Sequence, residues 1–132
     1  MPASFDLVTI DAVDSRLLAN FWSAALFLHE TEEEDQGRWI VLGSTRRERI
    51  LGIQRITGLE IAPGAIAGSQ KVRIHLDLAC ALEEFAAEVN RLVSLGAREL
   101  RPRRVESYGS IATLADPEGN MFDLCAYVSA ER

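Results

Sequence analysis

The sequence lacks a long hydrophobic run, and its acidic residues outnumber its basic ones. The longest apolar stretch is about five residues, at 24–28, whereas a helix needs roughly 20 such residues to cross a bilayer. The first residues, Met1 to Asp6, lack the basic start and the apolar run of a signal peptide. The net charge of −6 argues against a nucleic-acid surface, which needs a basic face. We therefore expect a cytoplasmic protein that binds neither membranes nor nucleic acid.

Cysteine is also scarce, which excludes a disulfide-rich secreted domain. The two cysteines, Cys80 and Cys125, lie in apolar segments with strand character. Such cysteines are usually free and buried, so we expect two free thiols, with a disulfide or a reactive thiol as the alternative.

The length and composition are those of one soluble globular domain, which we expect to span residues 1–132. A chain of 132 residues buries roughly two thirds of its unfolded surface, enough for a core without disulfides. Its hydrophobic share of 48% and charged share of 26% are ordinary for this class.

The hydrophobic period switches from strand to helix and back in the same order twice. The first copy predicts a strand, a helix that begins near Asp14 and Ser15, and three more strands. The second copy predicts the same order, with Gly96 ending its helix. The expected strands are 5–12, 30–35, 38–43 and 50–56, then 72–80, 97–105, 108–115 and 121–127.

The repeated order predicts an α+β fold of two tandem βαβββ modules that form a curved mixed sheet around a pocket. Module one covers about 5–56, a linker 57–71, and module two about 72–127. Landmarks of the two halves keep an offset of 68 or 69 positions, namely Leu7 with His75, Gln54 with Asp123, and Trp39 with Tyr108. Pairing two such units buries surface that neither would bury alone.

Strand alternation separates an apolar face from a polar one in each module. In the fifth predicted strand Val72, Ile74, Leu76 and Leu78 should face the helix, which leaves His75 and Asp77 on the opposite face. In the same way Thr9, Gln54 and Asp123 should face away from the helices. Charged residues within strands are unfavourable and often mark a site.

We therefore expect His75, Asp77, Gln54 and Asp123 to line a common pocket, with Thr9 beside them. Trp39 and Tyr108 are candidate aromatic walls, and core or rim packing is the alternative for both. For the polar residues the alternatives are a solvated sheet face and a dimer interface with satisfied polar pairs.

Several segments resemble a known family over almost the whole chain, from Phe5 to Tyr127. They are Phe21-Trp22, Gly52-Ile53-Gln54-Arg55-Ile56, His75-Leu76-Asp77-Leu78, Leu95-Gly96-Ala97 and the segment from Leu114 to Asn120 with the turn Asp116-Pro117-Glu118-Gly119. Together they resemble the vicinal-oxygen-chelate superfamily of glyoxalase I, bleomycin resistance proteins and extradiol dioxygenases, and most closely its glyoxalase-like domain group from actinobacteria.

The resemblance implies metal-ligand positions at Leu7, Gln54, His75 and Asp123. Leucine cannot bind a metal and glutamine is a weak ligand, so only His75 and Asp123 are good ligands. We therefore assign no cofactor firmly; one divalent metal ion is the candidate, held by His75, Asp123 and Gln54, with Asp77 or water filling in.

The resemblance also carries departures from the family pattern. Extradiol cleavage needs two histidines and a carboxylate on one face, and the second histidine, His29, follows the first helix away from that face. Extradiol dioxygenase activity is therefore not expected. Phe27 stands where relatives usually carry glycine, which predicts an altered turn.

Two functions from different classes follow from the resemblance. One is a lyase or isomerase that acts on a small carbonyl compound, with His75, Asp77 and Asp123 as catalytic residues and Gln54, Thr9, Trp39 and Tyr108 contacting the ligand. The other is sequestration of a drug-like or metabolite ligand without catalysis. The expected partners are a small-molecule ligand and, by resemblance, a second copy in a homodimer.

Overall fold

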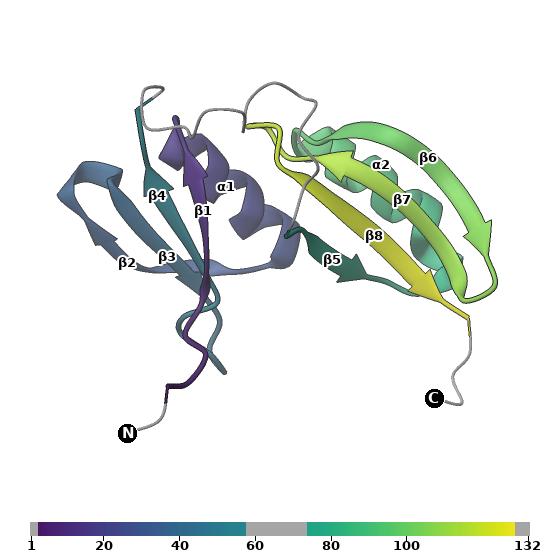
Figure 1. The fold of residues 1–132 in the computed structure, drawn as a ribbon, viewed down its shortest axis with the longest axis horizontal. Helices are drawn as coiled ribbons and strands as arrows, with labels where there is room; N and C mark the ends of the chain where they lie inside the picture. Colours follow the sequence, from purple (N-terminus) through teal and green to yellow (C-terminus); the bar gives the residue numbers. More distant parts are fainter. Residues whose placement is uncertain (1–2, 58–73, 129–132) are drawn as a thin grey trace. The chain divides into compact units, whose positions relative to one another are not determined.

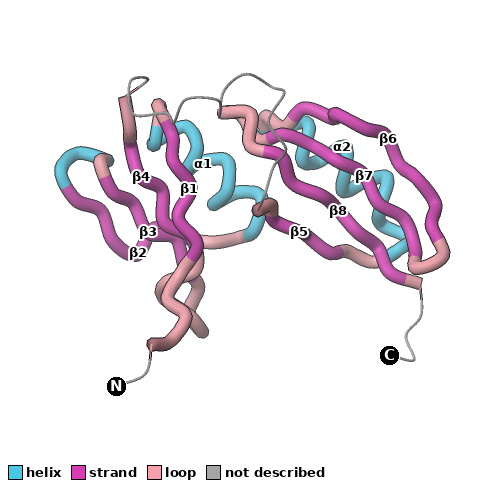
Figure 2. Tube along the Cα trace, in the orientation of Figure 1, coloured by secondary structure: helices cyan, strands magenta, loops and turns pink. Residues whose placement is uncertain are grey.

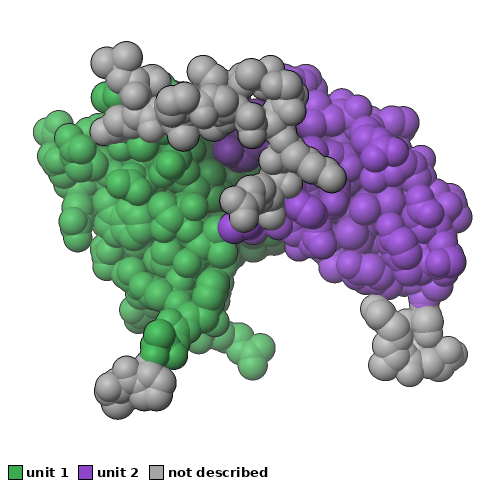
Figure 3. Space-filling model, viewed as in Figure 1, with its two compact units in different colours: residues 1–70 green, residues 71–132 purple. Residues whose placement is uncertain are grey.

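The computed structural model describes residues 3–57 and 74–128, which fold as parts of two compact units, residues 1–70 and 71–132 (Figure 3). In each unit an α-helix lies across one face of a four-stranded mixed sheet (Figures 1 and 2). The expected linker at 57–71, apart from Thr57, and Val72 of the fifth predicted strand lie outside the described residues.

The first unit has the order strand, helix, strand, strand, strand. Its sheet runs β1-β4-β3-β2, with β1 parallel to β4 and the other neighbours antiparallel. The elements are β1 (Val8–Ala12), α1 (Ser15–Leu26), β2 (His29–Glu34), the short 3-10 turn η1 (Asp35–Gly37), β3 (Trp39–Gly43) and β4 (Leu51–Arg55).

Helix α1 begins where the sequence predicts, because the Asp14 carboxylate accepts a hydrogen bond of 3.1 Å from the backbone N–H of Leu17. Its apolar residues at helical spacing are buried and pack against β3 and β4. The Phe21 and Trp22 rings meet edge to face, with centroids 5.0 Å apart. The helix ends at Phe27, whose φ of 57° and ψ of 43° are left-handed.

The second unit repeats this order with its own helix. Its sheet runs β5-β8-β7-β6, with β5 parallel to β8. Gly96, with φ of 127°, ends the helix as predicted. The elements are β5 (Leu76–Ala79), the 3-10 turn η3 (Leu82–Glu84), α2 (Phe85–Leu95), β6 (Arg98–Glu106), β7 (Gly109–Ala115) and β8 (Met121–Tyr127).

The connection between β7 and β8 is held by one buried carboxylate. Asp116, 3% exposed, accepts hydrogen bonds from the backbone N–H groups of Glu118 and Asn120, both 2.9 Å long. The Asn120 side-chain amide also donates to this carboxylate. Gly119 donates its N–H to the Asp116 carbonyl, so the tight turn expected from Asp-Pro-Glu-Gly is present.

The α+β fold of two βαβββ units is thus confirmed, while one detail of the fifth strand is wrong. Ile74, expected to face the helix, is 81% exposed. The pairing of β5 with β8 begins only at Leu76 and Phe122. Ile74 lies before this pairing, so the alternation of side-chain directions along the strand does not extend to it. Phe122 and Leu124 of β8 are buried on the helix side as predicted, and α2 contacts β8.

Neither of the described helices, α1 and α2, combines the length and the apolar character needed to cross a membrane. Both cysteines are free, as expected, with Cys125 buried and Cys80 partly exposed.

Candidate functional site

A histidine and two carboxylates converge on the face of the second sheet that points away from α2. Asp77 of β5 is the ladder partner of Asp123 of β8, so their side chains project side by side. His75 lies two residues before Asp77 and reaches both. Its Nε2 atom is 3.2 Å from Oδ1 of Asp77 and 3.3 Å from Oδ2 of Asp123.

Asp123 is the best-supported member of this cluster. Its other oxygen, Oδ1, accepts a hydrogen bond of 2.6 Å from the hydroxyl of Thr113, its ladder partner on β7. Thr113 is 5% exposed, and its oxygen accepts a hydrogen bond of 3.3 Å from Nη2 of Arg104 on β6. Because Arg104 donates to the hydroxyl oxygen, the single hydroxyl proton is left to point at Asp123. Thr113 and Arg104 are absent from the sequence-based site.

The cluster has the donor set of a metal site, and two of its three separations have the spacing of one. Ligand atoms each about 2.1 Å from one ion, with bonds 90–110° apart, lie roughly 3.0–3.4 Å from each other. The separations of 3.2 and 3.3 Å around His75 Nε2 fall in this range. The three ligand atoms all lie within 4.8 Å of one another. One imidazole with two carboxylates suits Mn(II), Fe(II) or Zn(II).

Cys125 lies two residues beyond Asp123 on the same face of the strand. Burial raises the pKa of its thiol, and the negative charges of Asp77 and Asp123 act in the same direction. A hydrogen bond with Tyr127 and the charge of Arg104 oppose that rise in pKa. The thiol is therefore protonated at neutral pH and is a poor nucleophile there.

Three of the predicted ligand-binding residues share one face of the first sheet. In the ladders Thr9 lies opposite Gly52, and Gln54 lies between Asp11 and Trp39. The Trp39 ring lies against Gly52 where a Cβ would project, with its Cζ3 atom 2.9 Å from that position. Its indole N–H donates a hydrogen bond of 2.9 Å to Glu32.

The internal offset gave the wrong partner for Asp123. The first strands of the two units can be matched by setting Val8 of β1 against Leu76 of β5, so that Thr9 corresponds to Asp77. The ladder partner of Thr9 is Gly52 and that of Asp77 is Asp123. The counterpart of Asp123 in the first unit is therefore Gly52 and not Gln54. The constant offset failed at this position because the segment between the first and the fourth strand is longer in the second unit than in the first. In the first unit this position is Gly52, which has no side chain, and the Trp39 ring packs against it.

Tyr108 lies in the turn before β7 and is 45% exposed, with its ring centroid 6.2 Å from that of Tyr127. By ladder register Trp39 corresponds to Ile111 and not to Tyr108. The structure thus brings together His75, Asp77 and Asp123 within the second unit. A common pocket that joins them with Gln54, Thr9 and Trp39 of the first unit stays a prediction.

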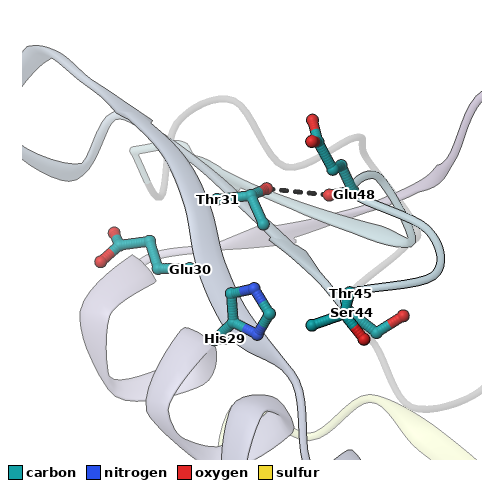
Figure 4. A pocket seen from close by; sticks show the side chains of 6 residues that line it. All are labelled: His29, Glu30, Thr31, Ser44, Thr45 and Glu48. Atoms are coloured by element: carbon teal, nitrogen blue, oxygen red, sulfur yellow. Dashed lines mark hydrogen bonds between the residues drawn. The ribbon is translucent and has the colours of Figure 1, made fainter.

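The first unit also contains a cavity of about 450 Å³ that the sequence did not indicate (Figure 4). It lies between the start of β2 and the loop after β3, and the Thr31 hydroxyl donates a hydrogen bond of 2.8 Å to the Glu48 carbonyl beside it. None of the predicted site residues contributes to it. Its lining consists of His29, Glu30, Thr31, Ser44, Thr45 and Glu48, most of them exposed.

Comparison with known proteins gives the family and the fold. The family model described as glyoxalase-like domain matches residues 7–125. Comparison with curated protein sequences gave no match.

Solved structures of the same fold include three proteins with different functions. A glyoxalase/bleomycin resistance protein/dioxygenase family enzyme from Burkholderia phytofirmans PsJN is 20% identical, with a TM-score of 0.73 over 96% of this chain and 100% of that one. A variant of the fosfomycin resistance protein FosX from Listeria monocytogenes, in complex with Mn(II) and 1S,2S-dihydroxypropylphosphonic acid, is 15% identical, with a TM-score of 0.70 over 97% and 93%.

The third, TnmS3, is an antibiotic binding protein from Streptomyces sp. CB03234, 17% identical, with a TM-score of 0.62 over 96% of this chain and 97% of that one. At these identities the structures support the fold alone, whereas the family model covers most of the sequence. With its two βαβββ units, the chain belongs to the glyoxalase-like domain family of the vicinal-oxygen-chelate superfamily.

Proposed function

We propose that this protein binds a small organic molecule at the polar face of the second sheet, through a divalent metal ion held by His75, Asp77 and Asp123. The observation that carries the proposal is the convergence of His75 Nε2 on both carboxylates at 3.2 and 3.3 Å. An imidazole N–H can be shared between two acceptors, so the proposal rests on the donor set: one nitrogen and two carboxylate oxygens around a common point can together hold a divalent cation. A shared cation satisfies all three ligand atoms.

Each residue of the cluster has a distinct part in the proposal. Asp123, with a side chain 16% exposed and one oxygen held by Thr113, is the rigid ligand. His75 supplies the nitrogen ligand, and its side chain is 39% exposed. Asp77, 55% exposed, is the carboxylate with most freedom to accept a proton from a bound molecule. A divalent ion here would polarise a carbonyl oxygen of the ligand, the requirement of a lyase or isomerase on a small carbonyl compound.

Direct measurement of metal binding tests the proposal. Mn(II) added to the purified protein should bind at one site, detected by loss of the free-ion electron paramagnetic resonance signal. His75→Ala and Asp123→Asn should abolish this binding. His29→Ala, which removes the other histidine, should leave it unchanged. Wild-type protein that binds no Mn(II), or a His75→Ala variant that binds it as wild type does, overturns the proposal.

The second candidate function is sequestration of an aromatic ligand without metal. The observation that favours it is the Trp39 ring packed on Gly52, because a half-buried indole offers a stacking surface. TnmS3, of the same fold, is an antibiotic binding protein. A thermal-shift screen in the presence of EDTA separates the two candidates, since a ligand at 100 times its dissociation constant adds about 2.7 kcal/mol. Stabilisation that survives EDTA and is lost in Trp39→Leu supports sequestration.

We further propose that residues 1–132 act as one domain in a cytoplasmic homodimer, which rests on the family resemblance. Light scattering after size-exclusion chromatography tests the dimer, and a monomer at micromolar concentration contradicts it.

A further inference from the structure

Strand β6 carries a row of arginines toward the face that holds His75, Asp77 and Asp123. In the ladder with β7, Arg101 lies opposite Thr113 and Arg104 opposite Ile111, while Arg98 lies opposite Ala115. Ladder partners project to the same face of a sheet, and Thr113 contacts Asp123 on the polar face. Residues three positions apart in a regular strand face opposite sides. Two register shifts in β6 place Arg98, Arg101 and Arg104 on the same face in spite of this spacing. Arg103, by contrast, lies over the ring of Phe85 in α2.

None of these three arginines forms an ion pair with any described residue, although two carboxylates lie on the same face. Arg104 instead donates from Nη2 to Thr113 and from Nη1 to the Pro102 carbonyl, both at 3.3 Å. Its guanidinium is thereby anchored at the edge of the cluster and retains donors of its five N–H groups for a further acceptor. It is only partly exposed, which limits the loss of side-chain entropy on binding.

The charges on this face favour an anion once a metal is bound. The carboxylates of Asp77 and Asp123 balance the guanidinium groups of Arg101 and Arg104. The divalent ion of the proposed function, on which this step rests, then leaves an excess positive charge. Glu106, the acidic residue of β6 on the same face, lies at the other end of the strand, opposite Gly109.

We propose that the ligand of this site is an organic anion that carries a carboxylate or a phosphonate, and that Arg104, assisted by Arg101, binds its oxygens. A guanidinium offers two parallel N–H donors that match the oxygen spacing of either group. The anionic end of the ligand lies over β6, and its remaining oxygen atoms lie near His75 and Asp123.

Three probes of similar shape test the proposal by ligand-observed NMR on protein loaded with Zn(II). They are phenylphosphonate, benzoate and the neutral benzamide. The two anions should bind at least 10-fold more tightly than benzamide. The anion that binds more tightly shows whether the site prefers a carboxylate or a phosphonate. Arg104→Met should weaken anion binding 10- to 100-fold, as expected when a hydrogen-bonded charge is lost. Arg46→Met, which removes the same charge from an exposed loop of the first unit, is the matched control and should change nothing.

Arg104→Met also removes the hydrogen bond to Thr113. Two further variants therefore separate the loss of the charge from the loss of this hydrogen bond. Arg104→Lys keeps the charge without the paired donors and should weaken binding partly. Arg101→Met leaves Thr113 untouched and should weaken binding several-fold. Benzamide binding as tightly as the anions, or unchanged anion affinity in Arg104→Met, overturns the inference.

Zn(II) affinity, measured separately, distinguishes this failure from failure of the proposed function. If wild type binds no Zn(II), the metal role is lost, and anion binding by the metal-free protein that Arg104→Met abolishes still supports the inference. If Zn(II) binds and Arg104 has no effect, only the inference fails.

Discussion

The Thr113 hydroxyl donates a hydrogen bond of 2.6 Å to one oxygen of Asp123, while the other oxygen of Asp123 lies 3.3 Å from His75 Nε2. The carboxylate is therefore oriented from behind by a buried residue of the neighbouring strand. Groups that orient a metal ligand in this way typically change metal affinity 10- to 100-fold when they are removed.

Thr113→Val should therefore weaken Mn(II) binding about 10- to 100-fold, because valine keeps the shape of threonine and removes the donor. Thr113→Ser keeps the hydroxyl and should bind Mn(II) within a few-fold of wild type. Calorimetric titration of both variants gives the comparison. Equal affinities of the valine and serine variants would show that the hydrogen bond is structural only.

Phe27→Gly should stabilise the protein. Phe27 holds a left-handed conformation at the end of α1, with φ of 57° and a side chain 80% exposed. Residues with a Cβ pay roughly 1–2 kcal/mol for this conformation and glycine does not, so we expect a gain of about 1 kcal/mol. Urea denaturation measures it. Phe27→Ala is the control, since alanine retains the Cβ and should gain little.

Glu88→Gln should lower stability at neutral pH and have no effect in acid. Arg91 donates hydrogen bonds of 2.9 and 2.7 Å to the Glu88 carboxylate, which lower the pKa of Glu88 below its usual 4.5. A lowered folded-state pKa gives stability that is present above the unfolded pKa and is lost as the pH falls through the folded one. The expected loss at pH 7 is about 0.3–0.5 kcal/mol for such a helical pair.

Urea denaturation of wild type and Glu88→Gln at several pH values between 7 and 2 gives the comparison. The difference in unfolding free energy should shrink steadily below pH 4.5. A difference independent of pH would attribute the effect to packing.

Gly52→Ala should displace Trp39 and destabilise the first unit. The new Cβ would overlap the indole ring, whose Cζ3 atom lies 2.9 Å from the Cβ position. Overpacking of this kind costs about 1–3 kcal/mol. In NMR spectra the indole N–H signal of Trp39, bonded to Glu32, should shift, while that of the buried Trp22 stays in place. Two unchanged indole signals would contradict the packing.

The element order was predictable because it depends on local patterns. Apolar residues at helical spacing, Asp14 at the start of one helix and Gly96 at the end of the other act within a few residues of themselves. The convergence of His75, Asp77 and Asp123 was predictable in part, because alternation within β5 and β8 sets their common face. Alternation failed at Ile74, which lies before the first ladder pair.

The support of the cluster was not predictable from sequence. Threonine is common in strands, so Thr113 carries no signal until its ladder partner is known. Arg98, Arg101 and Arg104 share a face only because β6 contains two register shifts, and a pattern of period two places alternate residues together instead. Long-range register decides both features.

The carboxylate of Asp116 clamps the reversal of the chain between β7 and β8, and this has a consequence for how the family can vary. One residue inserted there would either break these hydrogen bonds or slide β8 by one position, and the slide would turn Asp123 toward α2, because neighbouring strand positions face opposite ways. Loop lengths usually vary freely in evolution. The length of this turn, however, decides which face of the sheet the Asp123 side chain lies on, seven positions after Asp116. The turn is therefore as much a determinant of the proposed metal site as the side chains that form it.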